Sequence, residues 1–118
     1  MQKEGFKKRL YKFVLQLLKF IGTLDTKDVV SRVVADQLTR SGTSILSNYI
    51  EGYSSSSKRE FTNFFAISLK SANESKVWLA LLRDSDRCDN LEANRLLKEL
   101  EEIAKIFAAS ILTLKGRK

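Results

Sequence analysis

Residues 5–21, GFKKRLYKFVLQLLKFI, give the clearest indication of the fold. Apolar side chains recur there every three or four positions, as they do along one face of an α-helix: Phe6, Leu10, Phe13, Leu17 and Ile21. Four further apolar residues widen that face: Val14, Leu18, Phe20 and Leu24. A wide apolar face suits a helix with two neighbours in a bundle, or with one neighbour and a second subunit. We predict such a helix over residues 5–21.

The same periodicity predicts three more helices. The second is expected over residues 27–51, with Asp25 or Thr26 as its N-cap and Gly52 ending it in a positive-φ conformation. Ser57 and Glu60 have the spacing of a capping box, which predicts a third helix from there to about residue 83. A fourth follows a cap at Asp89 or Asn90 and continues to about residue 114.

Small and hydroxylated residues occupy most of positions 41–48, in the middle of the second predicted helix. Gly42 has no side chain, so a neighbouring helix can approach closely there; a local bend is the alternative. We favour close packing. An ion pair between Arg40 and Glu74 is also expected, because the second and third helices bring these residues near each other when they pair about a turn near residue 55.

Composition supports a single all-α domain over residues 1–118. Proline is absent, glycine occurs five times and 43% of the 118 residues are hydrophobic, enough for one core. Helices are therefore uninterrupted, and the turn residues that a many-stranded sheet needs are missing. We predict an antiparallel up-down-up-down four-helix bundle.

Residue types that most enzymes and metal sites require are missing. There is no histidine, so the commonest general base and metal ligand are absent, and we expect no catalytic residue, metal or cofactor. Cys88 is the only cysteine, which we interpret as structural and typical of a reducing, cytoplasmic location. No apolar run is long enough to span a membrane, and the basic N-terminal segment, broken by Gln16 and Lys19, is expected to be retained.

Positive charge accumulates at one end of the predicted bundle. The start of the first helix carries +4, the turn between the second and third helices 0 and the end of the fourth +3, so this end holds the equivalent of the whole net charge of +7. The opposite end carries −2. A concentrated positive field attracts polyanions. The predicted phosphate-contacting residues are Lys3, Lys7, Lys8, Arg9, Lys12, Lys58, Arg59, Lys115, Arg117 and Lys118.

The excess positive charge is also compatible with two simpler roles. Basic termini can merely keep a protein in solution, and an acidic protein or an anionic lipid is an alternative ligand. Phe6 and Tyr11 lie among the basic residues and could stack on bases, but both fit the apolar face of the first helix, so we favour a core position for them. Nucleic acid, RNA or DNA, is the ligand we predict.

Part of the sequence resembles a bacterial four-helix-bundle family. The resemblance rests on Gln37-Leu38-x-Arg40, Ser44-Ile45, Asn48-x-x-Glu51-Gly52 and Ser57-x-x-Glu60-Phe61. That family includes proteins encoded in intervening sequences of large-subunit ribosomal RNA genes, and accessory variability determinants of diversity-generating retroelements. We assign structural polar roles to four residues: Arg40, Asn48, Glu51 and Glu74. The chain departs from the family at Leu46, where proline is usual.

The resemblance implies a homopentamer. In the retroelement branch it further implies a basic barrel that binds nucleic acid and a reverse transcriptase. The function we predict is a non-enzymatic, homo-oligomeric protein that contacts phosphates without reading base sequence. A protein-interaction or scaffold module, such as an accessory subunit of a reverse transcriptase, is the alternative.

Overall fold

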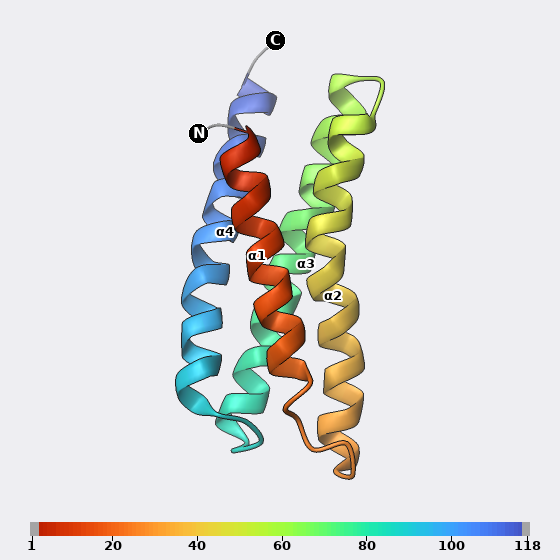
Figure 1. Ribbon diagram of the computed structural model, residues 1–118. Helices are drawn as coiled ribbons and strands as arrows, with labels where there is room; N and C mark the ends of the chain where they lie inside the picture. Colours follow the sequence, from red (N-terminus) through yellow and green to blue (C-terminus); the bar gives the residue numbers. More distant parts are fainter. Residues whose placement is uncertain (1–2, 117–118) are drawn as a thin grey trace.

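The computed structural model describes residues 3–116, and all four helices expected from the sequence are present in it. They are α1 (Lys3–Ile21), α2 (Val29–Ser54), α3 (Lys58–Asp84) and α4 (Asn90–Gly116). The molecule is elongated, about 50 Å long and 21 Å wide. Figure 1 shows consecutive helices side by side and joined by short turns. The predicted all-α four-helix bundle is confirmed.

Contacts between helices show the direction in which each one runs. On α2 and α3, Ser41 contacts Ser75 and Ser44 contacts Ser71, so position numbers rise on one helix as they fall on the other. On α1 and α4, Phe6 packs against Phe107 and Arg9 binds Glu99, again in opposite order. These pairs are antiparallel, in keeping with the up-down-up-down path in Figure 1.

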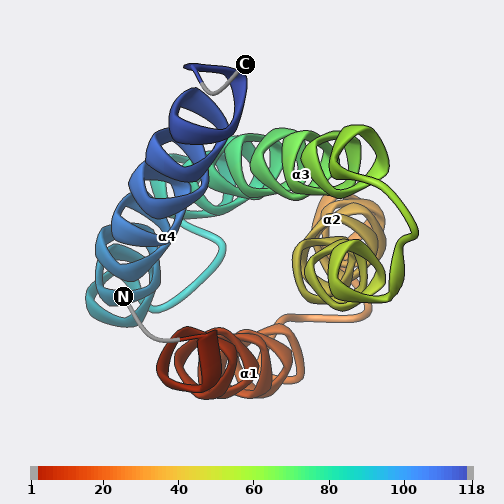
Figure 2. The ribbon, with the colours of Figure 1, turned by 90° about the horizontal axis from the view of Figure 1, so that it is seen from above.

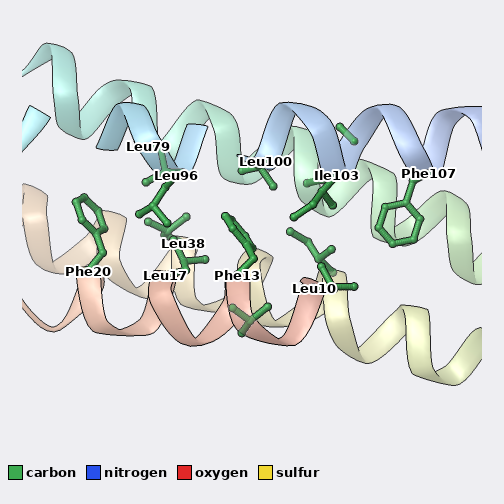
Figure 3. Packing of buried hydrophobic residues seen from close by; sticks show 14 of the residues in the cluster. Leu10, Phe13, Leu17, Phe20, Leu38, Leu79, Leu96, Leu100, Ile103 and Phe107 are labelled. Carbon is green, nitrogen blue, oxygen red and sulfur yellow. The ribbon is translucent and has the colours of Figure 1, made fainter. Parts of the chain in front are cut away.

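The core is a continuous apolar column along the bundle axis. Figure 3 shows leucine and phenylalanine side chains from all four helices meeting there. Toward the end where α1 begins, four aromatic rings pack together, those of Phe6, Tyr49, Phe65 and Phe107. Neighbouring ring centroids are 5.2 to 5.6 Å apart, a separation typical of edge-to-face and offset-stacked pairs. Phe6 therefore lies in the core, as favoured. Tyr11 does not, because 56% of its surface is exposed, and that prediction was wrong.

Apolar side chains occupy one face of each helix, and charged side chains cover much of the rest. Of the helices between residues 3 and 116, none is both long enough and apolar enough to pass through a bilayer.

Both ends of α2 differ from the prediction. The N-cap is Asp28, whose carboxylate accepts bonds from the backbone N–H of Ser31 at 3.1 Å and from its hydroxyl at 2.8 Å. Neither Asp25 nor Thr26 takes this place. Gly52 does not end the helix either: it is buried inside α2, and a Cβ there would lie 3.3 Å from the ring of Phe65. Close packing, not positive φ, accounts for this glycine.

The other two helix starts agree with the sequence. Ser57 caps α3 and accepts a bond from the backbone N–H of Glu60 at 3.1 Å. The Glu60 carboxylate reaches back to the backbone N–H of Ser56, one residue earlier than the cap. Asp89 precedes α4 and accepts bonds from the backbone N–H groups of Leu91 and Glu92. The capping residues thus satisfy donors that the first helical turn leaves unpaired.

Small residues in α2 allow two helices to approach it closely. Gly42 faces Leu17 of α1, whose Cδ2 atom would lie 2.3 Å from a Cβ at position 42. On the side facing α3, the hydroxyls of Ser41 and Ser75 are 2.7 Å apart and those of Ser44 and Ser71 2.8 Å apart. Close packing is confirmed, and α2 continues as a helix through this region.

Candidate nucleic-acid interface

Three segments far apart in the sequence meet at one end of the bundle, which we call the basic end. Figure 1 shows the start of α1, the turn between α2 and α3 and the end of α4 there, and Figure 2 looks onto that end, with α1 across from α3. Six of the predicted cations belong to these segments and are exposed: Lys7, Lys8, Lys12, Lys58, Arg59 and Lys115. Lys3 is the first residue of α1. Arg117 and Lys118 lie outside the described residues.

A carboxylate binds the guanidinium of Arg9, one of the predicted phosphate-contacting residues. Its Nε and Nη2 atoms donate to the two oxygens of Glu99 on α4, at 2.8 and 2.7 Å. This bidentate bond raises the pKa of Arg9 and neutralises its charge locally. Arg9 therefore joins α1 to α4, and its role in phosphate binding stays a prediction.

The acidic residues of α4 are likewise engaged in ion pairs. Besides Glu99, Glu101 binds Lys76 of α3 at 3.3 Å, and Glu102 lies 3.8 Å from Lys105 on its own helix. Within residues 3–116, no group of three or more acidic, cysteine or histidine side chains is placed to hold a metal ion. Cys88 packs against the core, and burial raises the pKa of its thiol, which keeps the thiol protonated and weakly nucleophilic.

The opposite end of the bundle is acidic, and its ion pairs leave that character intact. Arg87 binds Asp28 at 2.7 Å, and Arg83 binds Asp84 at 2.9 Å, so these two arginines are neutralised. Asp25, Asp86 and Asp89 then outnumber Lys27, which reproduces the −2 expected for this end. The molecule therefore has a positive end and a negative end.

The predicted structural polar residues lie along α2 and its contact with α3. Arg40 binds both Glu74 and the side-chain oxygen of Gln37, and Glu74 also accepts a bond from the indole N–H of Trp78 at 3.1 Å. The ion pair expected between Arg40 and Glu74 is present. Asn48 donates to the backbone oxygen and the hydroxyl of Ser44, both at 2.9 Å.

Glu51, the fourth residue of that set, is exposed near the end of α2. It lies toward the basic end, just before the turn that leads to Lys58 and Arg59.

Sequence reasoning missed a groove beside the basic end. Tyr11 and Leu15 of α1 and Leu46 and Ile50 of α2 line it, below a rim of lysines. The signal was present, because Tyr11, Leu15 and Leu18 recur at helical spacing beside the main apolar face. Periodicity alone does not separate such a second strip from the core face. The structure does, because these three side chains are 39–56% exposed.

Comparison with known proteins identifies a family. Residues 5–109 match the model of the 23S rRNA-intervening sequence protein family. The chain also resembles a solved structure from Bacteroides thetaiotaomicron, described as a protein of unknown function from the S23 ribosomal protein family, at 29% identity and a TM-score of 0.82. That similarity covers 89% of this chain and 96% of the other. None of the curated proteins matches this sequence.

Proposed function

The chain belongs to the 23S rRNA-intervening sequence protein family, and from this premise we propose that it is a non-enzymatic, homo-oligomeric protein that binds nucleic acid at its basic end. In this proposal its lysines and arginines contact phosphates and leave the base sequence unread. RNA and DNA share the phosphate chemistry on which such binding depends.

The observation that carries the proposal is a group of exposed lysines at the basic end. None of the ion pairs formed among residues 3–116 involves Lys7, Lys8, Lys12 or Lys115. By contrast, Arg9, Arg83 and Arg87 each bind a carboxylate. The four lysines are therefore available to displace counterions from a polyanion.

Lysines on a helix surface favour contacts that ignore sequence. A lysine ammonium is a compact charge on a flexible stem, suited to a phosphate oxygen, whereas base recognition usually relies on planar, bidentate donors. Of the two predicted arginines among the described residues, Arg9 is held by Glu99 and Arg59 lies at the start of α3. This composition supports positioning on a backbone more than reading of base edges.

Self-association is part of the proposal, and the outer face of α2 and α3 supports it. On α3, Leu81 lies two helical turns from Glu74 toward the acidic end, and Ile67 lies two turns from Glu74 toward the basic end. On α2, Val33 lies two turns from Arg40 toward the acidic end. All three are 43–54% exposed. Exposed apolar side chains that gather on one face are the kind of surface that a subunit contact buries. A homopentamer is the assembly that the family resemblance implies.

The first experiment measures binding of a fluorescent mixed-sequence RNA and the matching DNA by anisotropy. Affinity is compared at about 50 and 300 mM salt; four phosphate contacts to a single strand would weaken it about a hundredfold, because each contributes about 0.7 to the logarithmic slope. The test variant carries Lys7→Glu, Lys8→Glu and Lys12→Glu.

The matched control carries Lys19→Glu, Lys27→Glu and Lys98→Glu, three exposed lysines away from the basic end. Both variants lose the same net charge, so only position distinguishes them. We expect the test variant to lose binding and the control to keep most of it. Equal losses would show that net charge alone drives binding, and a wild-type protein that ignores both polymers at low salt would refute the proposal.

A protein-interaction module, for example an accessory subunit of a reverse transcriptase, is the second candidate. The groove between α1 and α2 favours it, because an apolar depression serves a protein partner better than a phosphate backbone.

A further inference from the structure

We propose that the groove between α1 and α2 binds an amphipathic helix of another protein, one with acidic side chains beside its apolar face. This inference goes beyond the proposed nucleic-acid binding and does not depend on it. The groove has an apolar floor and a basic rim, and such a helix would match both.

The floor of the groove is an apolar strip outside the fully buried core, although Leu46 packs against that core, and none of its residues belongs to the phosphate-contacting set. Tyr11 and Leu15 are one turn apart on α1, and Leu46 and Ile50 are one turn apart on α2. Tyr11, Leu15 and Ile50 are 56%, 47% and 42% exposed, and the groove encloses about 320 Å³. Two apolar positions per wall, one turn apart, match the spacing of apolar anchors on a docking helix.

Buried contacts on either side of the groove hold α1 and α2 close together at one of its ends and further apart at the other. At Gly42, the missing side chain lets Leu17 bring α1 close to α2. Two turns further along α2, Tyr49 inserts a whole ring against Phe6 of α1, with the centroids 5.4 Å apart. Figure 1 shows α1 leaning from α2 toward α4 as it approaches its first residue. The groove is thus a consequence of buried packing.

The rim of the groove specifies the charge of the occupant. Lys7, Lys8 and Lys12 line it together with one acid, Glu4, so its net charge is +2. A helix that presents leucines to the floor and carboxylates to the lysines would complement both features. A neutral or basic helix would place like or unpaired charges against this rim.

A second copy of this chain fits the groove less well. The exposed acids of α4, Glu101 and Glu102, have Lys98 and Lys105 beside them, and none of the large exposed hydrophobic residues in the described chain falls between positions 92 and 111. On the outer face of α3, Glu74 and Asp84 lie within one turn of the exposed Val77 and Leu81, but each already forms an ion pair, with Arg40 and Arg83 respectively. The acids of α3 and α4 that could meet the lysine rim are thus already paired within the chain, which favours a different protein as the occupant.

The test uses the full chain and a fluorescent peptide of about 16 residues, with leucines at i, i+3, i+4 and i+7 and glutamates at most other positions. A second peptide has the same composition with its leucines spread around the helix. Anisotropy is measured for the wild type, Leu15→Ser and Ile50→Ser, with Leu112→Ser as the control because Leu112 is 73% exposed on α4. Circular dichroism verifies the helix content of each variant.

Of the two peptides, we expect only the amphipathic one to bind. Its binding should be at least about tenfold weaker in Leu15→Ser and Ile50→Ser, since each lost anchor removes at least about 1.4 kcal/mol, and unchanged in Leu112→Ser. Equal binding of both peptides, or equal affinity of all variants, would overturn the inference. So would a change of molecular mass in the serine variants, which would assign the groove to a second copy. Binding of phosphatidylserine vesicles that these variants abolish, without peptide binding, would assign it to lipid.

The same variants separate this inference from the proposed function. Replacing leucine or isoleucine by serine leaves the net charge unchanged, so RNA binding should persist in Leu15→Ser and Ile50→Ser. Conversely, Arg59→Glu with Lys115→Glu alters the basic end outside the groove and should weaken RNA binding while peptide binding stays.

Discussion

Gly42 and Leu17 determine how closely α1 approaches α2. Leu17 is completely buried, and any Cβ at position 42 would overlap its Cδ2 atom. A glycine inside a helix costs about 1 kcal/mol relative to alanine, so its place in the middle of α2 has a packing reason. The sequence indicated close approach at this residue. Which helix approaches could not be inferred, because helical periodicity describes one helix and not its neighbour.

We expect Gly42→Ala to lower the free energy of unfolding by about 1 kcal/mol. Overpacking a core costs about 1–3 kcal/mol, and the better helix propensity of alanine recovers about 1 kcal/mol of it. Urea unfolding followed by circular dichroism measures the difference. Gly5→Ala is the control, since nothing lies within 4 Å of a Cβ there. A stabilised Gly42→Ala protein would show that Leu17 can move aside at little cost.

At the scale of the elements, Asp28 links the start of α2 to the loop between α3 and α4. Its carboxylate caps α2 through Ser31 and accepts a bond from Nε of Arg87 at 2.7 Å. The bond from Arg87, and then those from Ser31, lower the pKa of Asp28 to about 2. The sequence did not identify this cap, because Asp25, Thr26 and Asp28 are all capping residues and the Arg87 that also binds Asp28 lies 59 positions away.

Acid should weaken this link. The pKa of Asp28 is about 2 in the folded protein against an ordinary 3.8, so the stabilisation is complete above about pH 4 and is lost as the pH falls toward 2. Asp28→Asn keeps a good cap but loses the charge. We expect the melting temperature of the wild type to exceed that of Asp28→Asn at pH 5 and the gap to shrink by pH 2. A gap that is constant over this range would contradict the ion pair.

Across the whole molecule, three surfaces differ in chemical character. The basic end collects lysines, the α1–α2 groove combines them with apolar side chains, and the outer face of α2 and α3 presents apolar residues around Arg40 and Glu74. Only the antiparallel path of the four helices brings the start of α1 and the end of α4 to the same end as the turn after residue 54. These surfaces can therefore be altered one at a time.

Self-association should depend on the outer face of α2 and α3. We expect Ile67→Lys with Leu81→Lys to reduce the mass measured by light scattering toward the 13.5 kDa of one chain, because a buried contact cannot accommodate two lysines. Leu91→Lys with Leu112→Lys is the control, with the same charge change at residues that are 78% and 73% exposed on α4. Identical masses for both double variants would place the subunit contact elsewhere.

The amino-acid sequence by itself determined the four helices, the cap at Ser57, a cap at Asp89 or Asn90, and the charge of each segment near a helix end. These features depend on neighbours within a few turns or on a sum of charges, and both can be read along the chain. Tertiary structure alone decided that Glu99 holds Arg9, that Gly52 packs against Phe65 and that Tyr11 lines a groove. Each of these depends on which residue of another helix comes within contact distance, and helix tilt and register set that distance.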